Sequence, residues 1–135
     1  MLNIPIHPRQ LSASAAQVRA FFSDLRHLEE LMPESVSQFE AEESRCSFKL
    51  GSLGKIGLEI NAEASDSEKV LLQTINNIPF PVQLRINIKA LEPQTTEVGM
   101  NVQADMNPFM QMMAAKPLEQ FLGHLLKKLA ERFSS

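Results

Sequence analysis

Few side chains in this sequence have the type and spacing needed for acid–base, nucleophilic or metal chemistry. The three histidines, His7, His27 and His124, lie on separate segments and lack the short spacing typical of metal ligands. The single cysteine, Cys46, falls on the apolar side of an alternating segment, which favours an inert buried thiol over a nucleophile. The sequence therefore predicts no catalytic residue, no metal site and no cofactor, and leans away from an enzyme without deciding the question.

The other polar features have simple structural interpretations. His124 lies on the last predicted helix beside its apolar stripe, so it is the histidine nearest to an interior site, although a surface position fits it better. The acidic residues within 29–30 and 40–43 are typical of a solvated face. The GSLG segment at 51–54 is too short for a phosphate-binding loop and predicts a hairpin turn.

Alternation of apolar and polar residues predicts the strands that would position these side chains. Two prolines in the first segment favour an edge strand. In the segments 56–64, 82–90 and 98–104, every residue of the inward register is aliphatic, alanine or methionine. The facing of 70–75 is left open, because its apolar residues do not alternate. Strands are predicted at 2–6, 36–41, 45–50, 56–64, 70–75, 82–90 and 98–104.

Three helices are predicted from apolar residues at helical spacing. The first follows a cap at Ser12 or Ser14, and the second covers about 27–32 and ends before Pro33. The third covers about 107–133, with Asn107 as its cap and a proline at its first position. Its apolar stripe is formed by Leu118, Phe121, Leu122, Leu125, Leu126, Leu129 and Phe133.

The start of the third helix does not follow this stripe. Phe109, Met110 and Met113 project to a different side. Pro117 therefore indicates either a kink or a first part that buries a different face. A kinked core helix is the simpler interpretation. The functional alternative is a gate of adaptable methionines over the mouth of a pocket.

The element order predicts an α+β fold. A curved antiparallel sheet of about six or seven strands would wrap around the long C-terminal helix, with two short helices between strands 1 and 2. The 135 residues are expected to form one domain, 1–135. The net charge of −3 argues against a nucleic-acid partner, and no apolar run approaches the roughly twenty residues of a membrane span. With one cysteine and no secretory signal pattern at its start, the chain is expected to be cytoplasmic.

The chain resembles the START-like helix-grip superfamily, which includes the major birch-pollen allergen, polyketide cyclases and the small G-type proteins associated with carbon monoxide dehydrogenase. The resemblance lies in the element order and in two segments, FFSDLRHLEELMPESV at 21–36 and ADMNPFMQMMAAKPLEQFL at 104–122. It implies an apolar cavity between the sheet and the last helix. Members of this superfamily bind lipids, sterols, polyketides and plant hormones, and some are enzymes or co-chaperones.

Three functions follow from these features. The first is non-catalytic binding of a small lipid- or polyketide-like molecule between the sheet and the C-terminal helix. The second is a protein-interaction or assembly factor, as a homodimer or with another protein, that uses an exposed apolar surface. The third is a cyclase or hydratase, which is weakest because no inward acid or base is visible. The predicted ligand-binding residues are Phe109, Met110, Met113, Leu84, Ile86, Met100 and Val102.

Overall fold

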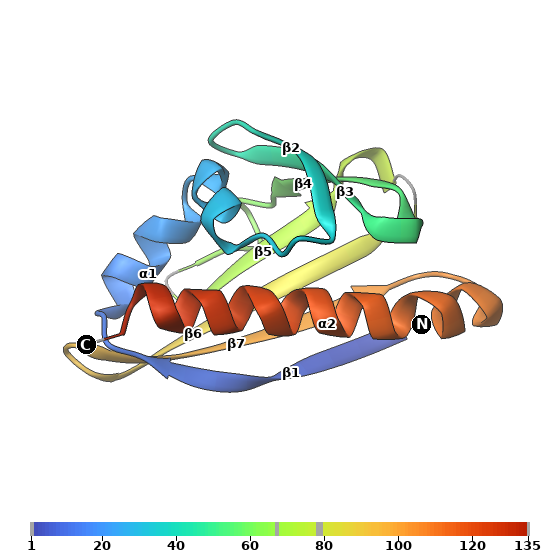
Figure 1. The fold of residues 1–135 in the computed structure, drawn as a ribbon. Coiled ribbons are helices and arrows are strands. Elements are labelled where there is room, and N and C mark those ends of the chain that lie inside the picture. The colour runs from blue at the N-terminus through green and yellow to red at the C-terminus, as the bar shows by residue number, and fades with distance from the viewer. Residues whose placement is uncertain (1, 67, 78–79, 135) are drawn as a thin grey trace.

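Seven antiparallel strands form one open, curved sheet, and a long helix lies across its inner face (Figure 1). The computed structural model describes residues 2–66, 68–77 and 80–134. The strand order is β1-β7-β6-β5-β4-β3-β2, so β1 and β2 are the edges. The strands are β1 Leu2–Leu11, β2 Val36–Ala41, β3 Arg45–Leu50, β4 Lys55–Ile60, β5 Lys69–Thr74, β6 Val82–Glu92 and β7 Thr95–Ala104.

The helices also occur where the sequence predicts them. Helix α1, Ala15–Phe22, is capped by Ser14, whose hydroxyl accepts the Gln17 N–H at 3.1 Å while the Gln17 side chain accepts the Ser14 N–H at 2.8 Å. The long helix α2, Pro108–Arg132, begins after Asn107, whose side chain accepts the Met110 N–H at 2.8 Å. Short 3-10 turns are η2, Gly51–Leu53, and η3, Ile75–Asn77. The predicted α+β helix-grip fold is confirmed.

Two predicted boundaries are wrong in detail. The second helix is a 3-10 helix, η1, Leu25–Leu31, because the Asp24 carboxylate caps it by accepting the Arg26 N–H at 3.0 Å. The strand predicted at 56–64 ends at Ile60. The Asn61 side chain accepts the Ala64 N–H at 3.1 Å, and the Ser65 hydroxyl donates to the Asn61 carbonyl at 2.7 Å, which turns the chain away.

The inner face of the sheet and one stripe of α2 form the core. The inward register of β6 and β7 is buried as predicted, and β5 is oriented by pairing Val70 with Ile86 and Leu72 with Leu84. Helix α2 contacts β1, β7 and η1. Its buried residues are Ala114, Leu118, Phe121, Leu122, Leu125, Leu126 and Leu129.

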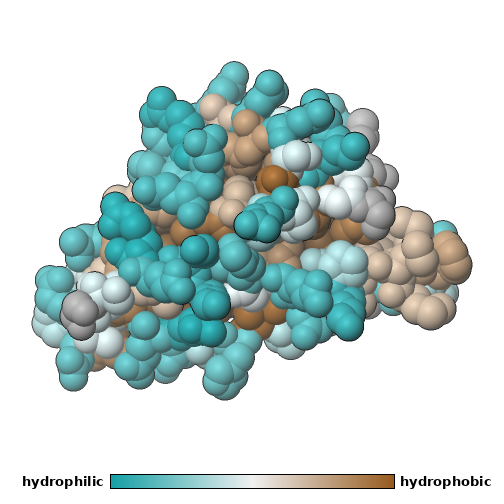
Figure 2. All heavy atoms as spheres, viewed as in Figure 1, coloured by the Kyte–Doolittle hydropathy of each residue, from teal (hydrophilic) through white to brown (hydrophobic). Residues whose placement is uncertain are grey.

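The first turns of α2 do not join this core. The side chains of Phe109, Met112 and Met113 are 64%, 76% and 56% exposed, and the buried stripe begins at Ala114. Figure 2 shows an apolar surface at the end of the molecule where α2 begins. This agrees with the prediction that the start of the helix faces a different side.

Two buried threonines provide internal hydrogen bonds between distant elements. The Thr74 hydroxyl donates to the Phe80 carbonyl and accepts the Val82 N–H, both at 3.1 Å. The fully buried Thr96 hydroxyl, on β7, donates to the Ala13 carbonyl at 2.7 Å, just before α1. Both side chains are satisfied, so they stabilise the fold and do not offer reactive groups.

Replacing Thr96 tests this link between the sheet and α1. Thr96→Val keeps the shape but leaves a buried carbonyl without its donor, which should lower the free energy of unfolding by about 1–3 kcal/mol. Thr96→Ser keeps the hydroxyl and should lose only the methyl contribution, about 1 kcal/mol. Denaturant unfolding measures both values. A Thr96→Val variant as stable as the parent protein would show that the hydrogen bond contributes nothing.

Candidate functional site

A small apolar space lies between α2 and the inner face of the sheet. Its volume is about 10 Å³, room for one water molecule, whereas ligand sites usually occupy about 300–1,000 Å³. The implied internal cavity is therefore almost completely filled by side chains in this structure. The lining residues are Phe22, Leu28, Met32, Phe48, Leu58, Leu72, Leu84, Ile86, Met100, Phe121 and Leu125.

A larger cleft of about 360 Å³ opens on the outside of α2, opposite the loops at the ends of η1 and β3. The loops are fixed by a hydrogen bond from the Gly51 N–H to the Ser35 carbonyl at 3.3 Å. Gly51 adopts a φ of +47°, which favours glycine and lets the chain turn sharply after β3. The cleft is lined by Pro33, Ser35, Leu50, Gly51, Pro117, Gln120, Phe121 and His124.

Phe121 lines both the outer cleft and the inner space. Its ring is 6% exposed and lies 5.3 Å, centroid to centroid, from the ring of Phe48 on β3. A single aromatic side chain thus separates the surface cleft from the interior. Rotation of Phe121 would connect the two spaces without any change in the backbone.

His124 is the polar side chain of this cleft that lacks a complete set of partners. It lies three residues after Phe121, so the two side chains are neighbours on the helix surface. Its Nε2 atom is shielded from water and has no hydrogen-bond partner among the residues that the structure describes. A buried polar atom in this state is uncommon and calls for an explanation.

The residues predicted to bind a ligand fall into two separate groups. Leu84, Ile86 and Met100 line the inner space, and Val102 is buried beside them on β7. Phe109 and Met113 are exposed at the start of α2, and Met110 is partly exposed there. The structure thus brings the strand residues together behind Phe121 and leaves the helix residues at the far end of α2.

The cleft residues were missed because they come from three distant segments. Pro33 and Leu50 belong to loops, and Gln120 lies on the polar side of α2. Two local signals did point to this region. One was Pro117 inside the helix, which now lines the cleft, and the other was His124 beside the apolar stripe.

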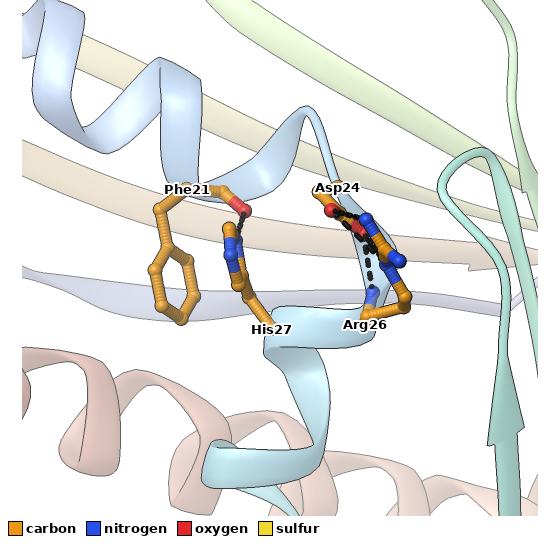
Figure 3. Close-up of polar contacts among 4 residues, drawn as sticks. All are labelled: Phe21, Asp24, Arg26 and His27. Atoms are coloured by element: carbon orange, nitrogen blue, oxygen red, sulfur yellow. Dashed lines mark hydrogen bonds and ion pairs between the residues drawn. The ribbon is translucent and has the colours of Figure 1, made fainter.

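The other polar groups have structural roles. In Figure 3 the Arg26 guanidinium lies against Asp24, with Nη2 2.6 Å from Oδ2, and these hydrogen bonds hold the pKa of the Asp24 carboxyl at about 2, below its ordinary range. His27 Nδ1 donates to the Phe21 carbonyl at 2.8 Å, and its ring stacks on Phe21 at 5.0 Å. These contacts fix the connection between α1 and η1.

A wider surface hollow of about 720 Å³ lies beside the start of α1 and the facing strands β5 and β6. Its wall mixes both signs of charge, with Asp66 and Glu68 beside Lys69 and Lys89. Such solvated charges offer little apolar surface to a ligand, and small-molecule sites are mostly apolar. We therefore regard the smaller cleft beside Phe121 as the candidate site.

Two further observations concern metals and membranes. Within residues 2–66, 68–77 and 80–134, no three histidine, cysteine, aspartate or glutamate side chains are grouped so as to hold a metal ion. No helix of that described part is long and apolar enough to cross a membrane.

The fold itself is shared with known structures. The sequence matches no protein-family model and no curated protein. The structure is similar to that of a START superfamily protein from Mycobacterium smegmatis, with a TM-score of 0.67, 15% identity, and coverage of 97% of this chain and 96% of that one. For XoxI from Bacillus cereus the TM-score is 0.73 at 15% identity, covering 98% and 96%. For the di-domain ARO/CYC protein BexL it is 0.71 at 12% identity, covering 97% of this chain and 46% of that one. The chain therefore has the START-like helix-grip fold that its sequence predicts.

The thiol of Cys46 tests the conclusion that this residue is inert. Burial raises its pKa to about 12, so very little reactive thiolate exists at pH 8. Alkylation by iodoacetamide, followed by mass spectrometry, should be slower in the native protein than in denaturant by roughly a hundredfold or more.

The matched control moves the thiol to the opposite face of the same strand. In the double variant Cys46→Ala and Ser47→Cys, the native thiol should react readily, because position 47 is only partly buried. Equal reaction rates for native and unfolded Cys46 would contradict the buried, inert assignment.

Proposed function

We propose that this protein binds a small hydrophobic molecule, lipid- or polyketide-like, between the sheet and α2, without catalysing a reaction. The observation that carries the proposal is the position of Phe121 between a 360 Å³ surface cleft and an entirely apolar interior. The ligand would occupy the cleft and extend inward as Phe121 rotates. In this proposal the protein acts in the cytoplasm and needs no cofactor.

The interior suits such a ligand because its wall can adapt. Met32 and Met100 line it, and their unbranched side chains repack at low cost. Leu84 and Ile86 provide the firm surface of the sheet behind them. No residue of this wall carries a charge or a hydrogen-bonding side chain. Binding should therefore depend on apolar area and not on head-group charge.

A displacement titration tests this function. The chain contains no tryptophan or tyrosine, so a neutral fluorescent probe such as N-phenyl-1-naphthylamine can be followed without background. Neutral isoprenoids and fatty acids should displace it, with affinity that rises with chain length and a negative heat-capacity change in calorimetry. Failure of the whole panel to bind would overturn the proposal.

Two variants locate the entrance. Phe121→Ala should speed probe association by about tenfold or more, because binding steps that await a conformational change are slow. Phe133→Ala, the matched truncation at the end of the same helix, should leave the rate unchanged. Met113→Glu should also leave binding unchanged. Loss of binding in Met113→Glu would instead place the entrance at the start of α2, where the sequence pattern predicted it.

A second function, protein interaction, is favoured by one specific observation. The exposed side chains of Phe109, Met112 and Met113 have the spacing of one helix face and form an apolar surface at the start of α2. Exposed apolar patches often mark contacts with a partner or a second copy.

Sedimentation of the pure protein tests self-association through this surface. The interaction function predicts a dimer that dissociates in Met112→Glu, while Lys116→Glu on the next turn serves as the charge control. A parent protein that stays monomeric up to about 0.1 mM, where even weak contacts with Kd near 0.1 mM would be half formed, rules out this form of the second function.

A further inference from the structure

The His124 ring lies in the wall of the outer cleft, immediately beside the residue that closes the interior. Its Nε2 atom is shielded from water and has no partner within the described part of the chain. The other polar side chains of the wall, Ser35 and Gln120, are exposed and keep water as a partner. Among these groups, His124 gains most from a ligand that supplies a hydrogen bond.

The chemistry of the cleft limits which ligand group can do this. A neutral imidazole nitrogen donates or accepts according to its tautomer. A hydroxyl group both donates and accepts, so it can pair with Nε2 in either state. A carboxylate only accepts, and it would bring a charge into a wall that has no charged side chain among the described residues.

We propose that His124 determines ligand specificity by hydrogen bonding, through Nε2, to a neutral oxygen, best a hydroxyl, at one end of an otherwise apolar ligand. The oxygen remains at the cleft while the apolar body extends past Phe121. This inference rests on the proposed function and adds to it the class of ligand: amphipathic alcohols in preference to hydrocarbons and fatty acid anions.

Ligands with one carbon skeleton and different ends test the inference. Three C10 isoprenoids, a hydrocarbon, its alcohol and its acid, displace the neutral fluorescent probe in separate titrations at pH 8. The alcohol should bind about tenfold more tightly than the hydrocarbon, the effect of one good hydrogen bond to an otherwise unpaired buried group, and more tightly than the acid.

Variants of His124 identify the group responsible. His124→Leu should bind the hydrocarbon as the parent protein does but lose the tenfold preference for the alcohol. His124→Gln, whose amide can reach the position of Nε2, should keep most of the preference. His7→Leu, an exposed histidine on the edge strand β1, is the matched control and should change neither affinity.

The outcomes separate the two proposals. If no isoprenoid binds, the proposed function fails, and this inference fails with it. If all three bind with no preference, or if the preference survives in His124→Leu, ligand binding stands and the role of His124 is overturned. Thermal unfolding provides a second readout: a large loss of stability in His124→Leu with unchanged preference would assign the residue a purely structural role.

Discussion

The packing of one apolar stripe of α2 against the inner face of the sheet is the interaction on which the rest of the structure depends. The sheet strands are apolar on that face, and α2 covers it with seven buried side chains. The C-terminal end of the helix is held firmly, since the Ser12 N–H donates to the Phe133 carbonyl at 2.8 Å and Arg132 lies 3.7 Å from Glu30. The other end, before Ala114, is exposed. The cleft, with Pro117 and His124 in its wall, lies between the fixed end and the exposed one.

Close packing and ligand binding oppose each other in this interior. A space of about 10 Å³ cannot hold a ligand, so Phe121 and the neighbouring methionines must move. Moving Phe121 loses its contact with Phe48, about 0.5–1.5 kcal/mol, and exposes a side chain whose burial contributes about 1.5–3 kcal/mol. A cost of a few kcal/mol corresponds to an open state populated at about 0.1–10%, and the apparent affinity falls by that fraction. A ligand with a large apolar area can offset such a cost, which favours long or multiply branched hydrocarbon bodies.

The sequence was sufficient for the fold and for half of the interior, because alternation is a local property. Leu84, Ile86, Met100 and Val102 are buried as predicted, since strand side chains alternate strictly between faces. The facing of β5 required its neighbours, because Val70, Leu71 and Leu72 are all apolar and only pairing decides which of them point inward.

The candidate cleft, in contrast, has no local pattern in the sequence. It joins a loop after η1, the end of β3 and the middle of α2, which are distant along the chain. Phe121 fits an ordinary core stripe, so its second position at the cleft could not be inferred from spacing. The volume of the interior was equally out of reach, because it depends on how Met32, Phe48 and Phe121 fill the space.

The central claim is that an apolar ligand reaches the inner face of the sheet past Phe121. Methyl-labelled NMR of the protein with a bound isoprenoid tests it most directly, through nuclear Overhauser effects between ligand protons and protein methyl groups. We predict contacts to the methyl groups of Met100 and Ile86, behind Phe121. Contacts confined to the methyl groups of Met112 and Met113, on the exposed start of α2, would contradict the claim.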